Sequence, residues 1–164
     1  MGMTQKTDII GKIKTKIGDS VIDTHDFRGD QTVTVKKESI SDLLRFLRDD
    51  PSLAFDFLMD LTAVDYLKRK PVRFEVVYHL FSLQHNHRVR VKTPVPESDC
   101  IVDSVVPLWK TSNWYEREIW DLYGIKFRGH PDLRRILLYE EFKGHPLRKD
   151  YPINKRQPLI GPIN

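Results

Sequence analysis

Cysteine is nearly absent from this sequence, since Cys100 is the only one in 164 residues. A single thiol cannot form an internal disulfide bond and cannot supply a cysteine-based zinc site. Long apolar runs are absent too, because no stretch approaches the roughly 20 residues that a membrane-spanning helix requires. The N-terminal residues also lack the basic and then apolar order of a signal peptide. These absences favour a reducing, cytoplasmic setting.

Several motifs that mark common active sites are missing as well. The sequence has no Gly-x-Gly-x-x-Gly motif or P-loop for a nucleotide, and no Gly-x-Ser-x-Gly elbow for a nucleophilic serine. Six histidines are present, but none forms the i, i+3 or i, i+4 pair with which a helix binds zinc. We therefore expect no catalytic, cofactor or metal site in this chain.

Charged residues are present in ordinary amounts but are unevenly placed. The chain has a formal net charge of +4, with 40% hydrophobic and 30% charged residues, as in a typical single globular domain. Residues 126–156 contain nine Lys and Arg residues against four Asp and Glu residues, so this segment holds the excess positive charge. Such a segment suits an acidic protein surface, a nucleic acid or phosphate groups, and the simplest alternative is a solvated basic tail.

Hydrophobic periodicity predicts a mixture of helices and strands. The expected elements, in chain order, are a helix at 9–17, a strand at 32–35, a helix from 40 to about 50, a short helix at 55–61, a β-hairpin at 72–93 and a short helix at 101–109. The first strand of the hairpin has apolar residues on both faces and should be central. The predicted fold class is α+β, with helices packed on one face of a mixed, mostly antiparallel sheet.

Aromatic residues, glycines, prolines and opposed charges are densest between Trp114 and Pro152. Residues 114–123 predict a helix that Gly124 closes in a left-handed cap. The part beyond Phe142 is too poor in apolar periodicity to fold alone, so it is either disordered or bound along a partner. We therefore divide the chain into a single α/β domain at 1–123, which includes the 114–123 helix, and an extended basic C-terminal arm at 124–164 for partner docking.

The acidic residues of this helix have two interpretations. In a free-standing acid–base enzyme, Glu116, Glu118 and Asp121 would converge on a pocket with shifted pKa values. In a structural or interface role they would be neutralised by basic residues. The candidate ion-pair partners are Arg117, which is spaced i, i+4 from Asp121, and Arg134 and Arg135 further along the chain. Balanced charge favours the structural or interface interpretation.

Nucleic-acid binding is a further alternative, because the basic segment accompanies a sheet with aromatic residues. Sheets that bind RNA expose aromatic side chains on their central strands. Phe74, Tyr78 and Phe81 fall on both faces of the predicted strand, which suits core packing better than an RNA platform. The pattern therefore favours a protein partner.

The longest motif supports that view through a family resemblance. The segment from Glu116 to Pro152 reads EREIWDLYGIKFRGHPDLRRILLYEEFKGHPLRKDYP. It resembles the signature of the C-type subunit, the 30-kilodalton subunit, of the proton-pumping NADH–quinone oxidoreductase (respiratory complex I). Weaker similarity extends to residues 43–66 and 74–83, and the chain resembles the stand-alone form of this subunit, not the form fused to the D-type subunit.

The resemblance implies a non-catalytic structural subunit of the peripheral arm, which scaffolds the quinone-reduction module by binding the D-type subunit, the 49-kilodalton type, and neighbouring peripheral-arm subunits. It implies that this chain binds no cofactor of its own, while FMN, Fe–S clusters and quinone belong to partner subunits. The complex would lie at the cytoplasmic face of the bacterial inner membrane, with this chain attached only through its partners. Nucleic acid is not among the expected partners.

The motif also implies which residues matter. It assigns interface or structural roles, and no catalytic role, to Glu116, Glu118, Asp121, Gly124, Gly129, His130, Pro131, Arg134, Arg135, Arg148 and Asp150. Arg117 joins this set through its predicted ion pair. Truncation near Phe142 is expected to leave a folded domain that no longer co-purifies with the D-type subunit.

Overall fold

The computed structural model describes residues 8–157, and its largest element is a five-stranded sheet with the order β1-β2-β5-β4-β3. The strands are β1 (Val21–Phe27), β2 (Asp30–Val35), β3 (Phe57–Asp65), β4 (Phe74–Ser82) and β5 (His87–Val95). Neighbouring strands are antiparallel except for β2 and β5, which are parallel. The sheet is therefore mixed and mostly antiparallel, as predicted, and β4 lies inside it.

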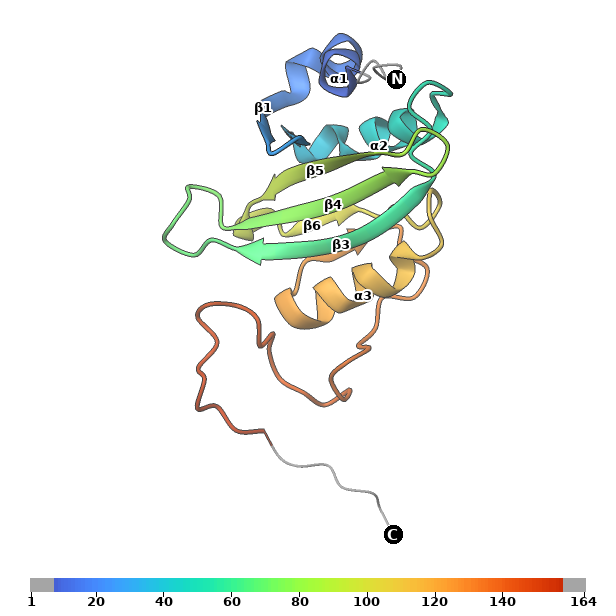
Figure 1. Cartoon of the computed structure of the whole chain (residues 1–164). Helices are drawn as coiled ribbons and strands as arrows, with labels where there is room; N and C mark the ends of the chain where they lie inside the picture. The colour runs from blue at the N-terminus through green and yellow to red at the C-terminus, as the bar shows by residue number, and fades with distance from the viewer. Residues whose placement is uncertain (1–7, 158–164) are drawn as a thin grey trace.

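Within residues 8–157, three α-helices and a second, two-stranded sheet accompany the main sheet. These elements are α1 (Ile9–Ile17), α2 (Ile40–Asp49), α3 (Ser112–Tyr123), β6 (Ile101–Asp103) and β7 (Lys126–Arg128), with single 3-10 turns at Gly18–Ser20, Lys37–Ser39 and Glu97–Asp99. Figure 1 shows α1 and α2 beyond the β5 side of the main sheet, and α3 beside β3 at its opposite edge. Within the described part of the chain, no helix is long and apolar enough to cross a membrane.

The helices pack on one face of the main sheet, as the sequence predicts. Strand residues alternate between faces, so Tyr78 and Val91, which are register partners, point to the same side. Both side chains are fully buried in one cluster with Ile13 of α1, Leu47 of α2 and Ile119 of α3. The apolar stripe predicted for α2 is buried along its whole length, which explains why a helix with so many charged residues is stable here.

The opposite face of the sheet contributes nothing to that cluster. We call it the open face, and it carries the other alternating set of side chains, which includes Asp30, Thr32, Thr34, Phe57, Asp60, Thr62, Val64, Glu75, Val77, His79, Phe81, Arg88, Arg90 and Lys92. Antiparallel sheets commonly have one face on the core and one face in water, and a mainly polar set of this kind is typical of that arrangement.

The predicted short helix at 55–61 is wrong, because residues 57–65 form β3. The register of β3 against β4 shifts between Leu58 and Asp60 at a β-bulge. The extra residue puts Leu58 and Leu61 on the same face although they are three residues apart. A spacing of three is also typical of a helix, so the bulge gave this strand a helical pattern.

The predicted short helix at 101–109 is also wrong. Residues 101–103 form β6, which pairs in parallel with β7, and only a single turn follows, with the Trp109 N–H donating to the carbonyl of Val105. The apolar residues of β6 and of the turn that follows it point into the same core. Their combined spacing resembles the apolar stripe of a helix. The pairing partner β7 lies more than 20 residues further along the chain, so local periodicity could not reveal it.

The other local predictions are confirmed, and one boundary differs. The hairpin at 72–93 forms β4 and β5, and α3 starts two residues before the predicted Trp114. Ile125 and Phe127 are buried in the core, so the packing of the domain continues past residue 123, where the predicted domain ended. The first seven residues of the predicted domain (1–7) and the last seven of the predicted arm (158–164) lie outside the described residues.

Candidate partner interface

Helix α3 and the C-terminal arm (residues 124–157 of the described chain) form one continuous surface. Gly124 adopts a left-handed backbone conformation with φ of 77° and donates its N–H to the carbonyl of Trp120, so the predicted helix cap is confirmed. Figure 1 shows the chain passing through β7 and then running without regular structure below α3. Because this segment has no repeating backbone hydrogen bonds of its own, side chains of the domain must fix its path.

Asp121 is the principal contact between α3 and the C-terminal arm. Its fully buried carboxylate accepts the backbone N–H groups of Ile136, Leu137 and Leu138 at 2.9–3.1 Å and pairs with Arg135 at 2.6 Å. Burial opposes ionisation of this carboxyl, but the four donors outweigh burial and lower its pKa below the ordinary value for Asp. The carboxylate therefore replaces the missing secondary structure of residues 136–138.

The predicted ion pair between Arg117 and Asp121 is wrong. Arg117 reaches across to the arm and donates to the carbonyl oxygens of Arg134 and Arg135, at 3.1 and 2.8 Å. Asp121 pairs with Arg135 of the arm, while the exposed Arg134 pairs with Asp132 at 2.9 Å. The i, i+4 spacing permitted the pair, but acceptors supplied by the arm outcompete it.

A second contact lies at the far end of the arm and is centred on Arg73. This buried guanidinium pairs with Asp65 at 2.9 Å, with Glu97 at 2.6 Å and with Asp150 of the arm at 2.6 Å. The backbone N–H of Lys149 also donates to Asp65, at 2.8 Å. The hydrogen bonds that Arg73 donates to Asp150 and Asp65 raise its pKa, so the guanidinium holds a permanent charge between three carboxylates.

Sequence reasoning missed Arg73 and Asp65 because nothing local marks them. Asp65 lies 84 residues before Lys149 in the chain, and its role appears only when β3 and the arm meet. Asp150, which the motif indicated, does take part in this network.

Arg148 and His145 fasten the middle of the arm to the C-terminal end of α3. The Nε of Arg148 donates to the carbonyl of Tyr123 at 2.6 Å, and Nδ1 of His145 lies 2.9 Å from the carbonyl of Asp121. Helix C-terminal carbonyls lack intrahelical donors, so these side chains satisfy exposed acceptors. Burial lowers the pKa of His145, and Nδ1–H can donate to this carbonyl from the neutral ring.

The three acidic residues of the enzyme hypothesis do not converge. Glu116 points into the core and is fully buried, Glu118 is exposed, and Asp121 points to the arm. The Oε1 atom of Glu116 accepts the N–H of Val105 at 2.7 Å, while Oε2 is buried and has no hydrogen-bond partner among residues 8–157. Burial raises the pKa of Glu116 to about 7. The prediction that arginines neutralise this residue is therefore wrong.

The remaining motif residues lie at the start of the arm. Nδ1 of His130 accepts the N–H of Asp132 at 3.0 Å, so its Nε2–H donates to the carbonyl of Asn113 at 3.1 Å. This bond joins the turn at Gly129 and the exposed Pro131 to the first turn of α3. Among residues 8–157, no group of three or more His, Cys, Asp or Glu side chains is arranged to hold a metal ion.

Residues 33–157 match the family model described as respiratory-chain NADH dehydrogenase, 30 Kd subunit. The chain belongs to this family. A protein of Citrifermentans bemidjiense, named as the C-type subunit of NADH-quinone oxidoreductase, is 46% identical over 164 residues, which are 99% of this chain and 100% of that protein. A protein of the same name from Rhodobacter capsulatus is 48% identical over 145 residues, which are 88% of this chain and 72% of that protein.

Two solved structures are similar in fold to this member of the 30-kilodalton subunit family. Nqo5, solved as a trypsin-resistant fragment (1-134), matches with a TM-score of 0.67 and 34% identity, over 76% of this chain and 96% of the fragment. A chain of the membrane-bound sulfane sulfur reductase, an archaeal respiratory membrane complex, matches with a TM-score of 0.75 over 90% of this chain and 85% of its own length. At 23% identity, the second match supports the fold alone.

In this member of the 30-kilodalton subunit family, large apolar side chains remain uncovered on α3 and the arm. Trp114 is 67% exposed, Leu137 is 61% exposed and Ile153 is fully exposed. The guanidinium of Arg117 lies 5.9 Å from the Trp114 ring centroid while it holds residues 134 and 135. An exposed Trp beside an Arg is a combination of the residue types that are enriched at the centre of protein interfaces, and the exposed leucine adds apolar area next to it.

Gly124 provides a prediction for this surface. A Cβ at this position would lie 2.7 Å from two atoms of the His145 ring and 2.8 Å from the Arg148 guanidinium, whereas a Cβ at Gly129 would meet nothing within 4 Å. Both glycines have positive φ, so alanine costs about 1 kcal/mol of backbone strain at either position. We expect Gly124→Ala to destabilise the protein by at least about 1 kcal/mol more than Gly129→Ala, because it also displaces the two side chains. Urea unfolding of both variants measures the difference, and equal losses would contradict the close packing.

Proposed function

We propose that this protein is a structural subunit of the peripheral arm of proton-translocating NADH-quinone oxidoreductase, and that it docks onto the D-type subunit, the 49-kilodalton type. In this role it holds the quinone-reduction module in register with neighbouring subunits. Membership of the 30-kilodalton subunit family supports the assignment to this complex. The observation that carries the docking surface is the exposure of Trp114 on α3 and of Leu137 on the arm, although the arm is firmly anchored.

The proposed division of labour leaves the redox chemistry to other subunits. Electrons would pass from NADH through FMN and Fe–S clusters in those subunits to quinone. This chain would bind no cofactor and would catalyse no step itself, and its contribution would be the relative position of its partners. It would lie at the cytoplasmic face of the bacterial inner membrane and would reach the membrane only through the complex.

The geometry of the C-terminal arm supports docking by a preformed surface. Asp121 holds the arm near its start and Arg73 holds it near residue 150, so the exposed side chains between these contacts are presented in fixed positions. An ordered surface loses less conformational entropy on binding than a disordered tail does. The sequence predicted a tail that is either disordered or bound along a partner. We propose instead that the domain itself orders the arm before the partner binds.

The acid–base enzyme and nucleic-acid alternatives have less support. Glu116, Glu118 and Asp121 point in three directions, so they cannot act on one substrate atom. Phe74 and Tyr78 are fully buried in the core and cannot stack on bases.

The docking surface can be tested with alanine substitutions of exposed residues, which leave the core intact. We expect the double variant Trp114→Ala/Leu137→Ala to weaken binding to the co-expressed D-type subunit by about 30-fold or more, the effect of losing an interface hot spot of about 2 kcal/mol. Leu83→Ala is the matched control, because Leu83 is equally exposed, at 66%, but lies in the β4–β5 turn. Binding of the double variant at the level of the control would refute docking through α3 and the arm.

A further inference from the structure

The open face of the main sheet carries an arginine, Arg90, that is held in place by hydrogen bonds and has no ion-pair partner among residues 8–157. The Nε of Arg90 donates to Nε2 of His79 at 2.9 Å, and its Nη1 lies 3.5 Å from Oγ1 of Thr32. Among residues 8–157, no carboxylate lies within ion-pairing distance of Arg90. By contrast, Arg88 and Lys92 on the same face lie 3.8 and 3.2 Å from Asp30 and Glu75.

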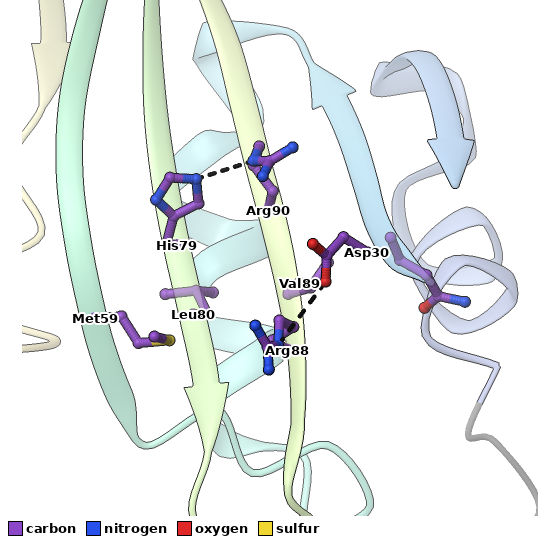
Figure 2. Close-up of a pocket in the computed structure, with 8 residues that line it drawn as sticks. Asp30, Met59, His79, Leu80, Arg88, Val89 and Arg90 are labelled. Carbon is purple, nitrogen blue, oxygen red and sulfur yellow. Dashed lines mark hydrogen bonds and ion pairs between the residues drawn. The ribbon is translucent and has the colours of Figure 1, made fainter. Parts of the chain in front are cut away.

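The bond from Arg90 also defines the state of His79. Because a guanidinium only donates, Nε2 of His79 must accept, and the ring proton must lie on Nδ1. Nδ1 in turn lies 3.3 Å from Oδ2 of Asp60. The side chains of Asp60, His79 and Arg90 thus form a chain across three adjacent strands, and a neutral imidazole orients the guanidinium. Figure 2 shows His79 and Arg90 side by side on β4 and β5, joined by this bond.

A shallow pocket lies next to this guanidinium. It has a volume of about 200 Å³, and Met59, His79, Arg88 and Arg90 are among the residues that line it. Met59 belongs to the β3 bulge and is 43% exposed, so one side of the pocket is apolar. Figure 2 shows Met59 and Arg88 on either side of β4, below the His79–Arg90 pair. An oriented guanidinium beside an apolar surface is suited to a carboxylate that arrives on a protein segment.

We propose that the open face is a second protein-docking surface, and that Arg90 there pairs with a single carboxylate on a segment of alternating charge in a neighbouring subunit. The proposal rests on the proposed function only in that the neighbour belongs to the same complex. It concerns a different surface from α3 and the C-terminal arm, because Arg90 lies on the sheet face opposite the one that packs against the helices.

The charges around Arg90 favour a protein over a polyanion. Asp30, Asp60 and Glu75 alternate with the basic residues on this face, and they would repel the regularly spaced phosphates of a nucleic acid or a membrane surface. A single carboxylate placed at Arg90 meets a guanidinium with no carboxylate partner among residues 8–157, whereas Asp30 and Glu75 already face Arg88 and Lys92. The mixed pattern therefore selects a partner with its own alternating charges.

Carbodiimide coupling in the assembled complex tests this pairing directly. Arg90→Lys places an amine where the guanidinium lies, and carbodiimide joins an amine to a carboxylate only when the two are in contact. We expect R90K to give a crosslink to an Asp or Glu peptide of another subunit, identified by mass spectrometry. Arg88→Lys is the matched control on the same strand, and we expect at least about ten-fold less of this crosslink from R88K.

The outcomes separate this inference from the proposed function. A complex that contains the R90K chain but yields only crosslinks within the chain, or to a second copy of it, would overturn the open-face proposal and leave the proposed function standing. Absence of the wild-type chain from the complex would overturn both. As a second measurement, Arg90→Gln should raise the fraction of chain washed from the complex several-fold relative to Arg88→Gln. If R90Q instead selectively lowers binding of the isolated chain to anionic phospholipid vesicles or RNA, the partner is a polyanion and the proposal fails.

Discussion

Asp121→Ala is expected to destabilise the protein by about 3–5 kcal/mol, the usual loss when one member of a buried charge pair is removed. The substitution would leave the Arg135 side chain, which is 13% exposed, without its carboxylate. It would also leave three consecutive N–H groups, those of residues 136–138, without an acceptor. Because these donors fix the path of the C-terminal arm, we also expect the arm to be cleaved faster by trypsin.

Urea unfolding and limited proteolysis check this expectation. Asp132→Ala is the matched control, because Asp132 also pairs with an arginine of the arm, but both side chains are more than half exposed, at 57% and 66%. An exposed pair contributes less than about 1 kcal/mol, so this variant should keep nearly the stability of the wild type and its resistance to trypsin. If the two variants lose the same stability, Asp121 is not the contact that holds the arm.

The contrast between these two aspartates also shows how far the sequence could predict the site. The motif identified Asp121 as a structural residue, and spacing predicted Arg117 as its partner. The structure supplies Arg135 and three backbone N–H groups in its place. Helical spacing states which side chains can meet on an isolated helix, but it contains no information about a segment that returns 14 residues later to supply better donors.

The fold was predictable wherever one face of a regular element is buried. Helix α2 has a clean period of 3.6 and strand β5 a clean period of 2, and both form as expected. The prediction failed at β3, where a bulge breaks the alternation, and at β6, which is three residues long and pairs with a distant strand. Both failures have one cause, since strand pairing is a non-local interaction and a short window of sequence records only the side-chain pattern that results from it.

The burial of Glu116 was equally invisible in the sequence. Glu116 and Glu118 are two residues apart on α3, and their surroundings are opposite: one is fully buried among core residues and the other is exposed. Helix geometry predicts that the two point in different directions, but it does not say which one meets the sheet. The answer depends on how α3 lies against β3 and β4, which sets the pKa of each carboxyl.

Glu116→Gln is therefore expected to make the protein more stable than the wild type at alkaline pH. The pKa of Glu116 is about 7 in the folded chain, above its ordinary value of 4.5, so folding favours the protonated form. The contribution of Glu116 to the free energy of unfolding is therefore most favourable below pH 4.5. It falls as the pH rises to about 7 and stays low above that pH. The difference between the two pKa values corresponds to about 3 kcal/mol, and this is the expected gain of the variant at pH 8.

Free energies of unfolding in urea, measured between pH 5 and 8.5, test this sign. His145 acts in the opposite direction, because its lowered pKa makes the folded chain lose stability as the pH falls through the ordinary value of 6.5. The difference between wild type and Glu116→Gln cancels that contribution and isolates Glu116, and it should widen steadily up to about pH 7. Glu118→Gln, on the exposed side of the same helix, should follow the wild-type profile throughout. Parallel profiles for wild type and Glu116→Gln would mean that the buried carboxyl is already satisfied as a charge, and that a donor reaches Oε2 after all.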